Sequence, residues 1–207
     1  AALAGCSRSG PRAVELAADV VAVRGGAGPA ERVRTAVEGL GGIGLFVRPG
    51  MKVALLPNSQ KENPGSFTHP EVVRQTIELA RSAGAAAVRV LSWLPARNWE
   101  ATGLDRTIRE AGGELVLVPT REERSFRRVP IPAGGLLKEA RLLVPFLESD
   151  CLITLPVVKH HVGNHFTGAL KNCMGLNYFQ SNRFFHERDD AGPAHLDQCI
   201  ADLNLAL

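Results

Sequence analysis

Short apolar runs that alternate with stretches of helical periodicity constrain the fold of this chain more than any other feature. We expect strands at residues 19–24, 52–56, 87–93, 114–119 and 151–156, and helices at 29–39, 70–83, about 100–111 and about 136–148. Strands that alternate with helices in this way are typical of βαβ units. The sequence therefore predicts an α/β fold, with an open, mostly parallel sheet and helices on both faces.

Proline, glycine and short polar residues mark the ends of these elements. Pro29 and Pro70 suit the first turns of two helices, and Thr68 or His69 is expected to cap the second. Residues 151–156 form an apolar run typical of a strand that is buried on both faces. Residues 129–132 contain two prolines, which favour an irregular segment or an edge strand because proline donates no hydrogen bond to a ladder.

The length and the charge limit the class of protein. A chain of 207 residues with 45% hydrophobic content can bury a single core. We therefore expect one α/β domain at residues 13–207, preceded by a signal remnant, a lipobox and a linker at residues 1–12. The net charge is only +3 and the basic residues are scattered, so nucleic acid is not an expected partner.

The four cysteines, Cys6, Cys151, Cys173 and Cys199, lack the close spacing that an iron-sulfur cluster or structural zinc requires. No iron-sulfur cluster is expected within this chain. Cys151 lies in an apolar run and is expected to be a small core residue. A disulfide between Cys173 and Cys199 stays open, because its geometry cannot be tested from sequence.

The amino terminus resembles the end of an exported lipoprotein signal. Leu3-Ala4-Gly5-Cys6 has the form of a lipobox and is followed by a polar linker, while the charged start of such a signal is absent, as in a chain truncated in front. This reading predicts a periplasmic or extracytoplasmic protein that is anchored to the membrane by acylated Cys6. The alternative is a chance tetrapeptide in an unstructured terminus.

Loops that leave the carboxyl ends of parallel strands form the ligand crevice of such sheets. Here these are the loops after Asn58, Trp93 and Pro156. The chain has no Gly-x-Gly-x-x-Gly or Walker-type loop, so a nucleotide held in either familiar way is not expected.

Several segments resemble the domain-of-unknown-function family 362. They are residues 46–58, 68–73, 82–85, 155–161, 167–175, 185–186 and 200–204. The resemblance implies the α/β fold and the neighbourhood of the site, but no reaction. The chain departs from it at Leu56, where the family usually has lysine. Family members usually also continue past Asn204, so the resemblance implies truncation behind as well.

Three histidines follow the predicted strand at 151–156. His160, His161 and His165 lie within six residues, and they could converge on a divalent transition metal such as zinc, nickel, iron or copper. His186 or a carboxylate from Glu187, Asp189 or Asp190 would complete the set of ligands. Under the alternative interpretation these histidines cap a strand, bond a carbonyl or face water.

A second cluster is suited to an anion. Thr167, Lys171 and Asn172 lie at a predicted helix start, where free N–H groups attract negative charge, and Lys159 lies nearby. The alternative is that Lys171 faces solvent or pairs with Asp202. Asn58 and His69 follow another strand and are expected to face this cluster.

His69, Lys159 and His161 are the candidate catalytic residues. An imidazole has an unperturbed pKa near neutrality, which suits a general acid or base. For His69 the alternative is a weak cap of the helix that starts at Pro70.

Two hypotheses follow for the function. The first is an enzyme or enzyme-like protein that binds a small anionic molecule with Asn58, Lys159, Thr167, Lys171 and Asn172. The second is a non-catalytic, lipid-anchored binding protein or accessory subunit of a periplasmic redox complex.

The lipobox interpretation predicts the fate of one variant. Expressed from the gene with its native signal, Cys6→Ser should move from the membrane fraction to the soluble fraction, because the acylated thiol is lost. Cys173→Ser serves as the control and should stay with the membrane. Identical fractionation of Cys6→Ser and the unmodified protein would count against lipidation.

Overall fold

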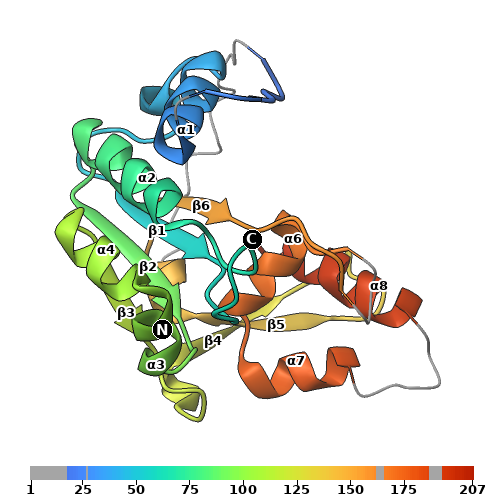
Figure 1. Ribbon diagram of the computed structural model, residues 1–207. Helices are drawn as coiled ribbons and strands as arrows, with labels where there is room; N and C mark the ends of the chain where they lie inside the picture. Colours follow the sequence, from blue (N-terminus) through green and yellow to red (C-terminus); the bar gives the residue numbers. More distant parts are fainter. Residues whose placement is uncertain (1–17, 27, 162–165, 187–192) are drawn as a thin grey trace.

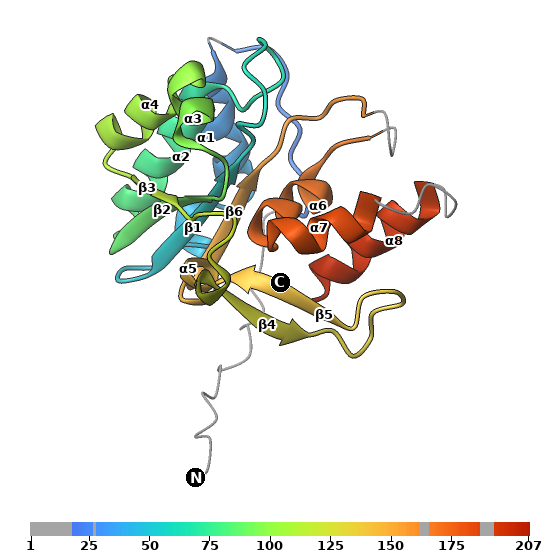
Figure 2. The same ribbon diagram turned by 90° about the horizontal axis from the view of Figure 1, so that it is seen from below.

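The computed structural model describes residues 18–26, 28–161, 166–186 and 193–207. Its centre is a four-stranded, wholly parallel sheet in the order β3-β2-β1-β6. The strands are β1 (Lys52–Pro57), β2 (Ala87–Ser92), β3 (Glu114–Leu117) and β6 (Cys151–Leu155). Helices cover both faces of the sheet (Figures 1 and 2), which confirms the predicted fold class.

The central strand explains why the sheet is covered on both sides. Successive residues of a strand point to opposite faces, and in β1 Val53 and Leu55 belong to one buried cluster whereas Ala54 and Leu56 belong to the other. A strand that is apolar on both faces is stable only where both faces are covered. The two clusters are the two halves of the core.

The helices divide between these faces. Four lie on the side of Val53: α1 (Pro29–Gly39), α2 (Pro70–Ser82), α3 (Ala96–Thr102) and α4 (Leu104–Glu110). On the other side lie α6 (Ala169–Asn172), α7 (Phe179–His186) and α8 (Pro193–Asn204). A short helix, α5 (Val144–Leu147), leads into β6. None of the helices in the described part of the chain has the length and apolar character of a membrane span.

A separate two-stranded antiparallel sheet replaces the helix that we expected at about 136–148. Its strands are β4 (Phe126–Pro130) and β5 (Glu139–Leu143), and only α5 at the end of the segment is helical. Ala140 and Leu142 face the core, while Arg141 between them donates its backbone N–H to Asn177. Pairing with distant residues thus overrides the local helical pattern, and β4 matches the edge-strand alternative for residues 129–132.

Three further expectations need correction. Residues 19–24 form no strand, and Val20 is 83% exposed, because this segment has no paired strand beside it. The helix expected at 100–111 is two helices that meet at Gly103, where φ is +69°. Strand β6 is an edge strand and only partly buried.

The described cysteines are all thiols. Cys151, Cys173 and Cys199 are free, so the structure contains no Cys173–Cys199 disulfide. Burial raises the pKa of the Cys173 thiol to about 11, as it does for Cys199 with a contribution from Asp202. Buried thiols of this kind are unreactive at neutral pH.

Asp202 anchors helix α8 to the turn between β4 and β5. Its carboxylate accepts the backbone N–H groups of Gly135, Leu136 and Leu137 at 2.6–2.9 Å, and the side chain of Gln198 at 2.8 Å. Burial alone would raise the pKa of this carboxyl, but these hydrogen bonds outweigh it and lower the pKa to about 2. Asp202 is therefore not the partner of Lys171.

This anchor predicts a pH-dependent loss of stability. Asp202→Asn should lower the free energy of unfolding by about 2 kcal/mol at pH 7, because bonds to a charged acceptor are lost. A depressed pKa means that the stabilisation is fully present above about pH 3.9 and disappears as the pH falls through about 2. Urea denaturation at several pH values should therefore show the difference between the proteins shrinking below pH 4.

Asp197→Asn, an exposed change on the same helix, is the control and should alter the free energy of unfolding by less than about 0.5 kcal/mol. Equal stability of Asp202→Asn and the unmodified protein at pH 7 would contradict the anchoring role.

Candidate functional site

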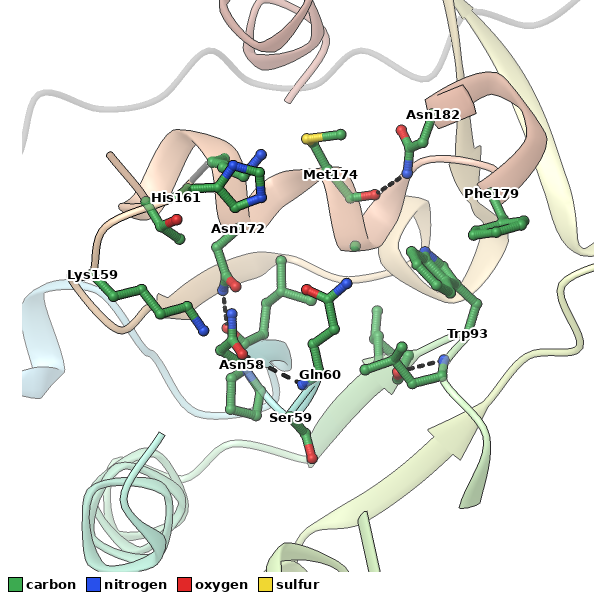
Figure 3. Close-up of a pocket in the computed structure, with 18 of the residues that line it drawn as sticks. Asn58, Ser59, Gln60, Trp93, Lys159, His161, Asn172, Met174, Phe179 and Asn182 are labelled. Carbon is green, nitrogen blue, oxygen red and sulfur yellow. Dashed lines mark hydrogen bonds between the residues drawn. The ribbon is translucent and has the colours of Figure 1, made fainter. Parts of the chain in front are cut away.

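A cavity of about 220 Å³ lies at the carboxyl edge of the sheet. The connections from β1 to β2 and from β2 to β3 proceed in one direction, whereas β6 joins the sheet on the opposite side of β1. The loops after β1 and β6 consequently diverge, which opens a crevice where open parallel sheets bind their ligands. The three loops expected from the sequence all contribute residues to the cavity (Figure 3).

One hydroxyl joins the carboxyl ends of β1 and β6. The Thr68 Oγ1 atom accepts the backbone N–H of Asn58 at 2.8 Å and donates to the Leu155 carbonyl at 2.6 Å. The backbone N–H of Thr68 also donates to the Asn58 carbonyl at 2.9 Å. Thr68 thus holds the long loop after β1 against β6, whereas the sequence suggested only a helix cap.

Asn172 makes the second link across these strand ends. Its Nδ2 donates to the Leu56 carbonyl at 2.6 Å and to the Thr154 hydroxyl at 2.9 Å. Asn172 ends the four-residue helix α6, so these bonds fix the wall that carries Lys171. A helix this short has little dipole, and the anion site that we expected at its start must therefore rest on side chains.

Lys159 and Lys171 supply positive charge to the cavity. Burial lowers the pKa of both ammonium groups. For Lys159 the nearby Lys61 adds to this effect, whereas for Lys171 the charge of Asp197 opposes it. The Lys159 ammonium donates to the Ser66 carbonyl at 2.6 Å, which ties it to the loop after β1. An ammonium has three donors, so this bond leaves Lys159 capacity for a ligand.

His161 lies on the same side of the cavity (Figure 3). Burial lowers the pKa of its imidazole, and the charges of Lys171 and other nearby cations lower it further. The side chain is therefore mostly neutral at neutral pH, a state in which an imidazole can accept a proton.

The described residues that line the cavity include five with basic side chains and no Asp or Glu. The basic residues are Lys159, His161, Lys171, Arg183 and His186. Arg183 and His186 come from α7, so this helix forms one wall of the cavity. A cluster of basic side chains in a partly closed space whose described lining contains no carboxylate favours a negatively charged occupant.

The opposite side of the cavity is aromatic. The loop after Trp93 was expected at the crevice, but no aromatic ring was among the predicted site residues. The rings of Trp93 and Phe179 lie 5.2 Å apart at an angle of 58°, a tilted arrangement typical of stabilising aromatic pairs. Figure 3 shows both rings across the cavity from Lys159, with Met174 between the two sides. Trp93 directly follows β2, and this position at a strand end is the sequence signal that points to it.

The structure brings together most of the predicted site residues. Asn58, Lys159, His161, Thr167, Lys171, Asn172 and His186 all line this cavity.

Two predicted residues, His69 and His160, are not among the lining residues. The Nδ1 atom of His69 accepts the backbone N–H of Glu71 at 3.2 Å, so His69 caps α2 instead of facing Lys159 across the crevice. His160 is exposed.

The metal and lipid predictions fall partly outside the described residues. Cys6, His165, Glu187, Asp189 and Asp190 all lie there. Among the residues that the structure does describe, no group of three or more His, Cys, Asp or Glu side chains is arranged to hold a metal ion. His161 and His186 are the two predicted ligands that share the cavity.

Fold and site together define an α/β protein with a cationic cavity at the carboxyl edge of a parallel sheet. The chain belongs to the family described as "Domain of unknown function (DUF362)", whose model matches residues 52–207. This match confirms the family resemblance seen in the sequence.

A curated relative is similar over much of the chain. It is the thylakoid-associated protein sll1697 of Synechocystis sp. (strain ATCC 27184 / PCC 6803 / Kazusa), with 33% identity over 151 residues. The alignment covers 69% of this chain and 44% of the relative, so the chain corresponds to less than half of that protein.

The Thr68 bridge predicts a loss of stability on removal of one hydroxyl. Thr68→Val keeps the side-chain shape but leaves the Asn58 N–H without its acceptor, so the free energy of unfolding should fall by about 2 kcal/mol. Thr107→Val is the control, because the Thr107 hydroxyl donates only within its own helical turn, to Gly103. Urea denaturation that shows equal effects for the two variants would contradict the bridging role.

Proposed function

We propose that this chain binds a small organic anion in the cavity at the carboxyl edge of the sheet. The observation that carries the proposal is the set of basic side chains, Lys159 and Lys171 above all, in a cavity whose described lining contains no carboxylate. An anion would be held by charge-assisted hydrogen bonds, which are stronger than those between neutral groups.

The energetics of the two partly buried lysines support this proposal. Burial disfavours the charged form of both lysines, as their lowered pKa values indicate. A bound anion would offset that unfavourable burial, since an opposite charge within a few ångströms stabilises an ammonium. Binding should therefore restore the lysine pKa values toward their ordinary range.

His161 supports an enzyme-like role for the same cavity. Its imidazole, mostly neutral at neutral pH, would act as a general base toward a bound ligand, while Lys159 and Lys171 would stabilise negative charge that develops on it.

In a second proposal the same cavity binds a ligand but catalyses no reaction. Here the chain is a membrane-attached binding or accessory protein, a role supported by its similarity to a thylakoid-associated protein. A metal held by His161 and His186 belongs to the same proposal, and metal analysis of the purified protein tests it. Turnover of a bound anion would favour the enzyme, whereas a stable protein complex without turnover would favour the accessory role.

The anion proposal is tested by calorimetric titration of the purified chain with benzoate and with inorganic phosphate. Lys171→Met should weaken binding of benzoate at least about tenfold, or about 1.4 kcal/mol, because it removes the charge and keeps most of the side-chain volume. That exceeds the effect of an ordinary surface charge.

Lys52→Met is the matched control. Lys52 is exposed at the amino end of β1, at the sheet edge opposite the cavity, so this variant should bind as the unmodified protein does. If neither probe binds, or if the two lysine variants weaken binding equally, the proposal is wrong.

A further inference from the structure

The aromatic side of the cavity indicates which anion fits. Trp93 and Phe179 come from different parts of the chain, the end of β2 and the start of α7, yet they contact each other at the cavity wall. Phosphate or a short aliphatic acid would use the cationic side alone. A ligand that contacts both sides needs a flat apolar part beside its charged group.

Two lining residues carry buried polar atoms without a hydrogen-bond partner among the described residues. These atoms are Trp93 Nε1 and Thr167 Oγ1, and Thr167 is only 4% exposed. Buried polar atoms in native proteins nearly always have partners, so each such exception calls for one. An indole N–H can only donate, which means that the missing partner of Trp93 is an acceptor.

These two atoms belong to residues of the cavity wall, whereas a third atom of this kind belongs to a core residue. Trp99 Nε1 is also buried without a described partner, but Trp99 is 1% exposed, belongs to the core on the opposite face and does not line the cavity. Trp93 and Thr167, unlike Trp99, line the same cavity as the lysines. Trp99 therefore provides an internal reference for any test at Trp93.

The volume limits the size of the ligand. Pockets that hold drug-sized molecules usually measure about 300–1,000 Å³, and this cavity measures about 220 Å³. It fits a molecule with about one ring and its substituents, and is too small for a dinucleotide.

We infer that the ligand is a planar, one-ring organic anion with a hydrogen-bond acceptor on the side away from its charged group. The anionic group binds Lys159, Lys171 and the Thr167 hydroxyl. The ring packs against Trp93 and Phe179, and the remote acceptor receives the Trp93 N–H. This inference rests on the proposed function and adds the class of ligand to it.

The test compares three probes: inorganic phosphate, benzoate, and 4-hydroxybenzoate, which adds an acceptor oxygen opposite the carboxylate. The chain has two tryptophans, so proton–nitrogen correlation spectra of the ¹⁵N-labelled full chain contain two indole N–H signals, and Trp93→Phe assigns them. 4-Hydroxybenzoate should move the Trp93 signal downfield, as a new hydrogen bond does, and leave the Trp99 signal in place.

Affinities from calorimetry complete the test. In the unmodified protein 4-hydroxybenzoate should bind at least tenfold more tightly than benzoate, and benzoate more tightly than phosphate. Trp93→Phe keeps an aromatic ring but removes the N–H, so it should abolish the advantage of 4-hydroxybenzoate while changing benzoate binding less than threefold. Phe179→Leu, at a partly exposed position, should weaken both aromatic anions and leave phosphate unchanged.

The outcomes separate this inference from the proposed function. If none of the three probes binds, both are wrong. If phosphate binds as tightly as the aromatic anions, or if Trp93→Phe leaves the preference for 4-hydroxybenzoate intact, the ligand class is wrong and anion binding stands. A Trp99 signal that moves as far as the Trp93 signal would also overturn the ligand class, because it would indicate a general change of the core.

Discussion

The parallel pairing of β1 with β6 is the constraint on which the rest of the structure depends. It places residues about 100 positions apart side by side, from Val53 beside Cys151 to Pro57 beside Leu155, and reverses the direction in which the sheet grows. At such a reversal the following loops must separate, and polar groups of the strand ends face the gap. Thr68 and Asn172 satisfy several of these groups and so fix the strand ends and loops that border the cavity.

The cavity combines charge and apolar surface in a way that limits its occupant. The two lysines are partly buried, and burial lowers the pKa of both ammonium groups, although the charge of Asp197 opposes this effect at Lys171. A bound anion would stabilise both charges. A water-filled cavity would solvate these charges but would leave the faces of Trp93 and Phe179 wet, whereas an organic anion would satisfy both sides together. The cationic side and the aromatic side of the cavity are therefore better explained by one ligand that contacts both than by two separate functions.

The sequence predicted the elements that local patterns determine, and it missed contacts between separate segments. Strand β1 and helix α2 are set by local patterns and were predicted within one residue at each end. The grouping of Asn58 with Lys159 and Lys171 followed from topology alone, because parallel strands end at the same edge. Strand β5 and the Trp93–Phe179 contact were missed, since both depend on pairing or packing with other segments, which the helical pattern of a single segment does not reveal.

The sequence also did not distinguish polar residues that hold the cavity wall from polar residues that have capacity to bind a ligand. Asn172 and Thr167 were both expected to bind the ligand because they share a short polar motif. Asn172, however, directs its two amide protons to Leu56 and Thr154, while the Thr167 hydroxyl has no described partner. A side chain whose donors are already used holds the wall, and one with an unused buried hydroxyl has capacity for a ligand. Changes at Asn172 should therefore alter folding and binding together, whereas changes at Lys171 or Thr167 act on the ligand more directly.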